Sequence, residues 1–145
     1  MENQLMNKLN IQLANWNVIN TKLQNYHWFV AGPDFFTLHA KFEEFYTEAQ
    51  GNIDEIAERI LAIGGKPVAT LRGYLELTTL NEAGNELQAK DMVSDLVRDY
   101  ERLVKGSKEL IELAEEANDH PTADMFTDIQ TSLEQHIWML QAYLR

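Results

Sequence analysis

The stretch NYHWFVAGPDFFTLHAKF, residues 25–42, contains a Gly-Pro break between two segments that carry apolar residues at helical spacing. His27 lies just before the break, and His39 lies just after it, twelve residues further on. Because the break ends one helix and begins the next, both histidines are expected near the hinge at one end of a helical bundle. What these two side chains do there decides the functional hypothesis.

Apolar residues recur every three or four positions along most of the 145-residue chain, and Gly or Pro interrupts them at few places. This pattern predicts five helices, at about 3–30, 35–63, 70–78, 90–117 and 121–143. Asp34 is expected to cap the second helix and Gly64 to end it, and residues 118–121 are expected to separate the last two helices. Four long helices, with a short one in the second crossover, predict a single all-α domain over residues 1–145, an up-down four-helix bundle.

The composition excludes several classes of protein and of site. The chain has no cysteine, which rules out disulfide scaffolds, thiol catalysis and cysteine-ligated metals. It has no run of roughly eighteen apolar residues that would span a membrane. Its first ten residues lack the features of a secretory signal, so a cytoplasmic location is expected. A formal net charge of -11 opposes affinity for nucleic acid, and it either attracts cations or serves solubility alone.

A helical wheel of residues 35–63 separates three faces. The apolar face consists of Leu38, Phe42, Phe45, Ala49, Ile53, Ile56, Ile60 and Ile63. The opposite face, expected in solvent, consists of Lys41, Glu44, Glu48, Glu55 and Arg59. Between them lies a third face that is neither a clean core face nor a plain solvent face, formed by His39, Glu43, Tyr46, Gln50, Asp54, Ala57 and Glu58.

The third face carries side chains that bind metals. Asp54 and Glu58 are four residues apart, so their carboxylates project from adjacent turns of the helix. Imidazole and carboxylate ligands together suit divalent iron, manganese or zinc. Each residue also fits a structural role, because a histidine near a helix end is more often a cap or an interface residue, and such an acidic pair is more often plain surface.

The spacing of these ligands requires a second chain. Asp54 lies fifteen residues after His39, which places them roughly 22 Å apart along the helix, and Glu58 lies roughly 28 Å away. One chain therefore does not bring all of them onto one ion. Two chains do so if the second helix packs antiparallel on its two-fold mate, with the axis near residues 47–49 and two identical sites in the dimer.

These motifs resemble the Dps family, the mini-ferritin branch of the ferritin-like superfamily. The resemblance covers almost the whole chain and is most specific in Asn25-Tyr26-His27-Trp28, Gly32-Pro33-x-Phe35, Leu38-His39, Phe42-Glu43, Asp54-Glu55-x-Ala57-Glu58-Arg59-Ile60 and the GGKP run at 64–67. It implies a ferritin-like bundle that assembles into a hollow shell of twelve subunits. Such a shell oxidises Fe(II), usually with hydrogen peroxide in preference to oxygen, stores ferric mineral and protects the cell from oxidative damage.

The resemblance also implies roles for single residues. It places the ferroxidase ligands, which hold two irons per site across a dimer interface, at His27, His39, Asp54 and Glu58. Glu43, one turn after His39, matches an acidic position that contacts the second iron. Trp28, beside His27, is placed to intercept stray one-electron oxidation, and packing at the dimer contact is an equally good explanation for it.

A further acidic group lies near the start of the last helix and consists of Asp119, Asp124 and Asp128. In the family that the chain resembles, this region forms acidic three-fold pores, so these residues are expected to draw cations inward. For Asp119 and Asp124 the alternative is the ordinary preference for Asp near a helix N-terminus. Glu43 and Glu44 are expected to help nucleate mineral on the inner wall.

Two absences separate this chain from related types of protein. Ordinary ferritins build the di-iron site inside one bundle with Glu-x-x-His motifs. Here Leu61 follows Glu58 at that spacing and Ile137 follows Glu134, so the motif is missing. Dps proteins that bind DNA typically use a Lys-rich tail, whereas residues 1–10 contain one Glu and one Lys. DNA binding is therefore not expected.

The other two histidines are assigned no ligand role. His120 is expected in a turn and His136 in the last helix. Two alternative functions stay open from the sequence: a non-enzymatic, oligomeric helical interaction protein whose acidic face only guides assembly, and a DNA-compacting protein for which iron is secondary.

Overall fold

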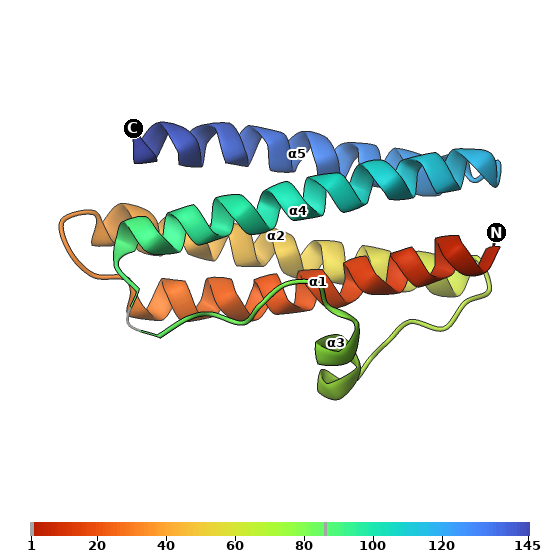
Figure 1. The fold of residues 1–145 in the computed structure, drawn as a ribbon, viewed down its shortest axis with the longest axis horizontal. Coiled ribbons are helices and arrows are strands. Elements are labelled where there is room, and N and C mark those ends of the chain that lie inside the picture. The colour runs from red at the N-terminus through yellow and green to blue at the C-terminus, as the bar shows by residue number, and fades with distance from the viewer. Residues whose placement is uncertain (1, 86) are drawn as a thin grey trace.

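The computed structural model describes residues 2–85 and 87–145, and every regular element within them is a helix. In chain order these are α1 (Glu2–Phe29), α2 (Phe35–Ala62), α3 (Leu71–Leu77), α4 (Ala89–Glu116) and α5 (His120–Leu144) (Figure 1). Four long helices and one short one confirm the fold predicted from the apolar periodicity, and each end lies within one residue of its predicted position. None of the helices in this part of the chain combines the length and apolar character needed to cross a membrane.

The bundle is built from two helical hairpins. α1 packs on α2, α4 packs on α5, and α1 also contacts α4 and α3. The crossover between the hairpins, residues 63–88, runs back along α1, so α2 and α4 point the same way while α1 and α5 point the opposite way (Figure 1). As a result the α1–α2 hinge and the C-terminus share one end of the bundle, and the α4–α5 turn lies at the other end.

The two ends of α2 differ in how they are stabilised. At the C-terminal end Gly64 adopts a φ of 89°, and the N–H of Gly65 donates to the carbonyl of Ile60 at 2.8 Å, which ends the helix as predicted. At the N-terminal end Asp34 occupies the cap position, but its side chain caps no helix N–H. Its carboxylate accepts a 2.8 Å hydrogen bond from the Tyr143 hydroxyl instead, which ties the end of α5 to the hinge. The expected side-chain cap is therefore wrong.

The turn between α4 and α5 is short. Asn118 has a φ of 58°, and Asp119 then caps α5 by accepting a hydrogen bond from the Thr122 N–H at 3.1 Å. Because the cap lies at Asp119, α5 begins at His120, with Pro121 in its first turn. His120 is thus the first residue of the helix, and the expectation that it lies in the turn is wrong.

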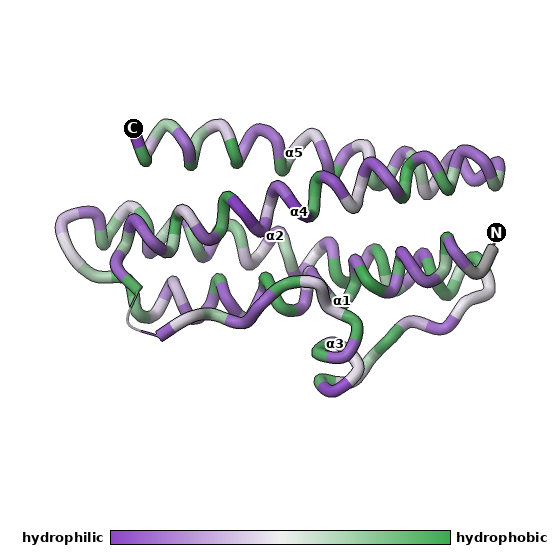
Figure 2. The backbone as a smooth tube through the Cα atoms, in the orientation of Figure 1, coloured by the Kyte–Doolittle hydropathy of each residue, from purple (hydrophilic) through white to green (hydrophobic). Residues whose placement is uncertain are grey.

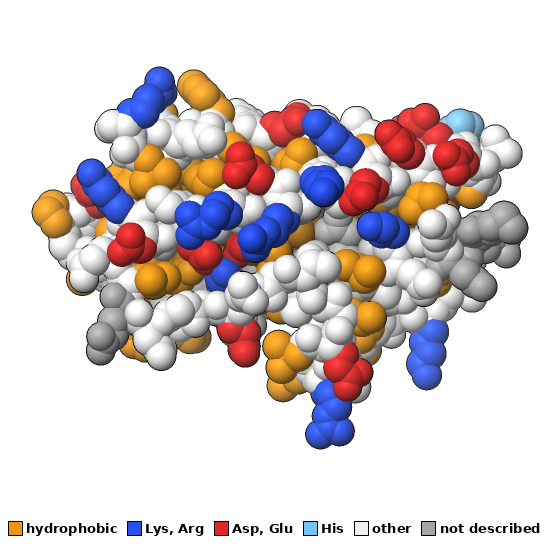
Figure 3. All heavy atoms as spheres, viewed as in Figure 1, with side chains coloured by type: hydrophobic (Ala, Val, Ile, Leu, Met, Phe, Trp, Pro, Cys, Tyr) orange, Lys and Arg blue, Asp and Glu red, His pale blue; other side chains and the backbone are white. Residues whose placement is uncertain are grey.

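The core lies between the four long helices. Its largest fully buried side chains include Trp16, Tyr26, Phe42, Tyr100 and Phe126. Six residues of the predicted apolar face of α2 are buried, while the other two, Ile53 and Ile63, are partly buried against the core. Hydrophobic and hydrophilic positions accordingly alternate along each long helix (Figure 2). On the outer surface shown in Figure 3, basic and acidic side chains are interspersed along α4.

Candidate metal centre

The hinge places His27 and His39 face to face. His27 comes from the last turn of α1 and His39 from the start of α2, and their imidazole centroids lie 3.7 Å apart with 14° between the ring planes. The Nδ1 atom of each ring lies 2.7 Å from the backbone carbonyl oxygen of the other residue. The two residues therefore hold each other through a reciprocal pair of hydrogen bonds.

This pairing sets the protonation of both rings. A carbonyl oxygen only accepts hydrogen bonds, so each Nδ1 must carry the proton and donate. In the neutral ring the lone pair is then on Nε2, the tautomer that a metal-binding histidine needs. Because each ring is oriented by the backbone of the other helix, His27 and His39 hold two Nε2 atoms whose lone pairs are free to accept a ligand.

Aromatic and acidic side chains surround the histidine pair. Phe35 stacks on His39 with centroids 4.9 Å apart, and Tyr46 meets the His27 ring edge-on at 5.5 Å. The Oε1 atom of Glu43 lies 3.8 Å from the Nε2 of His27. Glu43 is exposed while His27 is buried. The structure thus brings Glu43 to the histidines, in agreement with its predicted position one turn after His39.

Asp54 and Glu58 lie toward the other end of α2. The helix is continuous from Phe35 to Ala62, so the axial separation of roughly 22 Å between His39 and Asp54 holds in the folded chain. Both carboxylates are exposed. Within residues 2–85 and 87–145, no three His, Asp or Glu side chains come together as a group able to hold a metal ion. One chain carries the two halves of the predicted ligand set at two separate places.

Apolar surface adjoins the histidine half of the site. Trp28 is 65% exposed, and Phe29 and Phe36 are exposed as well. Large aromatic side chains left in water at the hinge are a common feature of protein–protein interfaces. Trp28 therefore lies on surface of this kind in the isolated chain.

The predicted solvent face of α2 is partly buried in the structure. Arg59 donates to the Asp119 carboxylate at 2.7 Å and to the Thr122 hydroxyl at 2.9 Å. Burial alone would raise the pKa of Asp119, but the hydrogen bonds from Thr122 and Arg59 outweigh it and hold this pKa below its usual value. Asp124 and Asp128 are exposed on α5. Of the three predicted pore residues, Asp119 is thus already engaged within its own chain.

A second contact on this face joins α2 to α5 near the middle of the bundle. His136 Nε2 lies 2.9 Å from Glu48 Oε2, and the Ser132 hydroxyl lies 3.2 Å from both atoms. Phe45 packs on the His136 ring at 4.6 Å. Glu48 was expected in solvent, and His136 was placed in the last helix with no ligand role, so this contact between residues 88 positions apart was not predicted.

A buried charged cluster between α1 and α4 was not predicted from the sequence. Lys22 Nζ lies 2.6 Å from a carboxylate oxygen of both Asp95 and Asp99, and the Tyr26 hydroxyl donates to Asp95 at 2.5 Å. Burial raises the pKa of Asp99 and of Tyr26, whereas Asp95, despite its own burial, has its pKa lowered by hydrogen bonds from Lys22 and Tyr26. A signal existed: Asp99 falls at an apolar position of α4, in the series Met92, Leu96, Asp99 and Leu103.

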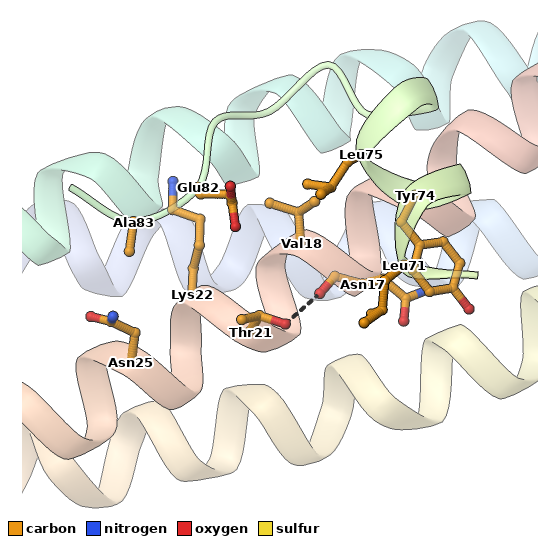
Figure 4. Close-up of a pocket in the computed structure, with 10 residues that line it drawn as sticks. All are labelled: Asn17, Val18, Thr21, Lys22, Asn25, Leu71, Tyr74, Leu75, Glu82 and Ala83. Atoms are coloured by element: carbon orange, nitrogen blue, oxygen red, sulfur yellow. Dashed lines mark hydrogen bonds between the residues drawn. The ribbon is translucent and has the colours of Figure 1, made fainter. Parts of the chain in front are cut away.

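A cavity of about 370 Å³ lies beside α1, away from the predicted metal ligands. Figure 4 shows it between α1, α3 and the segment around Ala83, with Leu71 and Leu75 on one side and Lys22 on the other. None of the predicted metal ligands lines it. A shallower hollow on α2 does gather predicted residues, since Glu43, Glu44 and Glu48 line it together.

Known proteins of one family resemble this chain over nearly its whole length. Residues 6–145 match the ferritin-like domain. The DNA protection during starvation protein 2 of Bacillus anthracis is 51% identical over 144 residues, which is 99% of each chain. The crystal structure of a Dps protein from Bacillus brevis superimposes with a TM-score of 0.97 at 50% identity, covering 99% of this chain and 96% of that one.

A more distant structure adds a chemical description. It is a Dps protein from Vibrio cholerae O1, described as a member of a broad superfamily of ferritin-like diiron-carboxylate proteins. That chain is 37% identical, with a TM-score of 0.95 and coverage of 99% of this chain and 90% of its own.

Proposed function

Since this chain belongs to the Dps family of ferritin-like diiron-carboxylate proteins, we propose that it is a ferroxidase that oxidises Fe(II), with hydrogen peroxide as the preferred oxidant, and stores the ferric product. Its substrates are then Fe(II) and peroxide, or oxygen in second place. The cell is protected because both reactants of radical chemistry are consumed together.

The observation that carries this proposal is the reciprocal hydrogen bonding of His27 and His39. It leaves two imidazole nitrogens side by side with their lone pairs free, and Glu43 stands 3.8 Å from one of them. Imidazole and carboxylate ligands suit iron in both oxidation states. Residues held by backbone hydrogen bonds need no rearrangement to accept the ion, which favours rapid binding.

The site is completed, in this proposal, by Asp54 and Glu58 of a second copy of the chain. Support comes from the helix geometry, because roughly 22 Å of continuous helix separates His39 from Asp54. Antiparallel pairing of two α2 helices about a two-fold axis near residues 47–49 places each histidine pair opposite the partner's carboxylates. A dimer of this kind holds two identical sites, each with room for two irons.

Two irons in one site suit the chemistry of peroxide. Two Fe(II) ions give one electron each, and the two electrons cleave the O–O bond of one peroxide, so no hydroxyl radical is left over. The carboxylates of Glu43, Asp54 and Glu58 carry negative charge that stabilises the ferric product relative to the ferrous substrate. The exposed Trp28 stands beside His27, where it either packs against the partner or accepts a stray oxidising equivalent.

Storage follows from assembly. We place six such dimers in a hollow shell of twelve chains, as the family resemblance implies. Asp124 and Asp128 are the free carboxylates at the start of α5 and are assigned to cation entry, while Asp119 contributes less because Arg59 and Thr122 hold it. Glu43 and Glu44, which share a hollow on α2, are assigned to nucleation of the mineral.

Anaerobic titration with Fe(II), followed by separate additions of peroxide and air, tests the function. Binding is expected to saturate at about two Fe(II) per chain, since each dimer carries two sites of two irons. Peroxide should then oxidise two Fe(II) per molecule, and faster than air. A non-enzymatic interaction protein would bind no stoichiometric Fe(II) and would be indifferent to His39→Ala, and that result would exclude the ferroxidase.

A further inference from the structure

We propose that Tyr26 is a one-electron donor that quenches oxidising radicals formed beside His27, and that Asp95 takes the phenolic proton as the electron leaves. The inference deepens the proposed function, on which it rests only for the source of the radical. The Tyr26–Asp95 pair itself belongs to this chain and is complete without iron.

The position of Tyr26 suits it to this role. It is the residue before His27, so a short covalent path joins the two rings, and its ring packs on Phe42 with centroids 5.8 Å apart. The side chain is fully buried, which shields a radical from solvent. Its hydroxyl donates to the Oδ2 atom of Asp95 on α4 at 2.5 Å.

A phenol is oxidised readily only if its proton leaves with the electron, because the protonated radical is a very strong acid. Asp95 is a carboxylate already at hydrogen-bond distance, so the proton moves along an existing bond. A buried carboxylate that is protonated normally leaves its cation unpaired, which is costly. Here the cation has a second partner.

Lys22 provides this second pairing. Its Nζ lies 2.6 Å from Asp95 and 2.6 Å from Asp99, and the side chain is 3% exposed. Figure 4 shows it extending from α1 with the nitrogen directed toward α4. Lys22, Asp95 and Asp99 together carry one net negative charge. A proton on Asp95 neutralises this group of three, while Asp99 keeps the ammonium paired. Arg98 and Arg102, at 3.8 and 3.6 Å, lie on the exposed side of the two aspartates.

When a single Fe(II) meets peroxide, it gives one electron and yields Fe(III), hydroxide and a hydroxyl radical. The hydroxyl radical takes one electron from Tyr26 and becomes hydroxide. The Tyr26 O–H bond breaks, its proton forms a new O–H bond on Asp95, and a neutral tyrosyl radical remains. Total charge and atoms are unchanged by the second step.

Trp28 and Tyr46, whose ring meets the His27 ring edge-on at 5.5 Å, are the competing donors, and their surroundings differ from those of Tyr26. Trp28 is 65% exposed in the single chain and lies on surface assigned above to contact with a partner, and Tyr46 is only partly buried. Tyr26 is enclosed and has a proton acceptor in place. A radical formed on a residue next to His27 is therefore expected to be transferred to Tyr26.

Iron-free photo-oxidation of the assembled protein tests the pair directly. A ruthenium polypyridyl complex with persulfate oxidises the protein under light, and electron paramagnetic resonance of the frozen sample identifies the radical. The wild type is expected to give a tyrosyl signal that Tyr26→Phe loses, with an exchangeable proton, held by Asp95, hydrogen-bonded to the phenoxyl oxygen. Asp95→Asn removes the proton acceptor and should lower the radical yield as well.

Tyr143→Phe is the matched control, because the Tyr143 hydroxyl also donates to a carboxylate, that of Asp34, but at the exposed end of α5. It should keep the tyrosyl signal, as should Trp28→Phe. Size-exclusion and thermal unfolding establish that each variant is assembled and folded. A tyrosyl signal that survives at full size in Tyr26→Phe, or that vanishes in Tyr143→Phe, overturns the inference.

A second arm uses peroxide in excess over Fe(II), with a spin trap for hydroxyl radicals in solution. Trapped radical is expected to increase in Tyr26→Phe relative to the wild type and to Tyr143→Phe, and equal trapping in all three argues against quenching by Tyr26. The two failures are distinguishable. Loss of Fe(II) binding in the titration rejects the ferroxidase whatever the photochemical result, and the photochemical result decides Tyr26 without iron.

Discussion

Arg59 of α2 donates a 2.7 Å hydrogen bond to Asp119, the residue that caps α5. The contact joins the C-terminal end of α2 to the N-terminal end of α5, and Arg59 directly follows Glu58 in the sequence. Thr122 completes the arrangement, since its hydroxyl accepts from Arg59 and donates to the other oxygen of Asp119. The end of α2 that carries the proposed carboxylate ligands is thereby fixed to the neighbouring helix.

Replacing Asp119 should destabilise the fold. Asp119→Ala removes a helix cap and leaves Arg59 without its carboxylate, and we expect a loss of about 1–2 kcal/mol in the free energy of unfolding. Urea denaturation at neutral pH measures it. Asp124→Ala is the control, because Asp124 is also acidic and near the start of α5 but is exposed, and it should change stability by less than about 0.5 kcal/mol. Equal effects of the two changes would contradict the assigned contact.

The contribution of Asp119 should also depend on pH, with a definite sign. Its pKa is lower in the folded chain than in the unfolded chain, so the folded state favours the ionised form. The stabilisation is then fully present above the ordinary aspartate pKa and is lost as the pH falls through the lower, folded-state pKa. The difference in unfolding free energy between wild type and Asp119→Ala should shrink in acid. A difference that grows in acid would show that the carboxylate is not the stabilising group.

Helix positions were predictable because they depend on local pattern. Apolar spacing and the breaks at Gly32-Pro33, Gly64 and Pro121 locate each helix end to within one residue. The separation of His39 from Asp54 follows from helix rise alone, so the distance between the two sets of candidate ligands in one chain was also predictable. These inferences require no knowledge of how one helix lies against another.

Contacts between helices were not predictable in the same way. The wheel placed Arg59 and Glu48 in solvent, yet α5 covers both, because a wheel describes one helix and not its neighbours. The reciprocal bonds of His27 and His39 depend on the conformation of the hinge between them. Asp99 in the apolar series of α4 signalled a buried partner, but only the register of α1 against α4 identifies it as Lys22.

Duplex DNA should bind negligibly at physiological salt. The net charge is -11, and basic side chains along α4 are interspersed with acidic ones, so few phosphate contacts form together (Figure 3). A gel-shift assay in the absence of added metal is the measurement. Retardation of duplex at sub-micromolar protein would refute the expectation and would favour the alternative of a DNA-compacting protein.

Iron entry should depend on the free carboxylates of α5. Changing Asp124 and Asp128 together to Asn should slow iron uptake at low salt while the assembly stays intact, because two of the charges that attract cations are removed from each chain. Stopped-flow oxidation measures the rate of iron uptake, and size-exclusion chromatography shows whether the assembly is intact. The control changes Glu112 and Glu116 to Gln, which removes the same charge from exposed positions on α4. If both double variants slow uptake equally, total charge matters and the entry assignment is wrong.

The shared site makes a prediction about mixed subunits. One variant lacks His27 and His39, and the other lacks Asp54 and Glu58. Each alone should lose rapid Fe(II) oxidation, because every site then misses one of its two sets of ligands. In a mixed dimer, the chain with intact histidines faces the chain with intact carboxylates, which rebuilds one of the two sites while the other site loses both sets.

Random mixing in equal amounts should therefore restore about a quarter of the wild-type sites, since half of the dimers are mixed and each has one complete site. The subunits are mixed by co-expression or refolding so that exchange between finished assemblies is not needed, and mass spectrometry verifies that both chains are present. The rapid phase of Fe(II) oxidation after peroxide is the readout, compared with each variant assembled separately. If a site were confined to one chain, no mixture would exceed the separate variants. Verified mixed assemblies that react only at that background rate would therefore reject the shared site and leave the reciprocal histidine pair as a purely structural feature of the hinge.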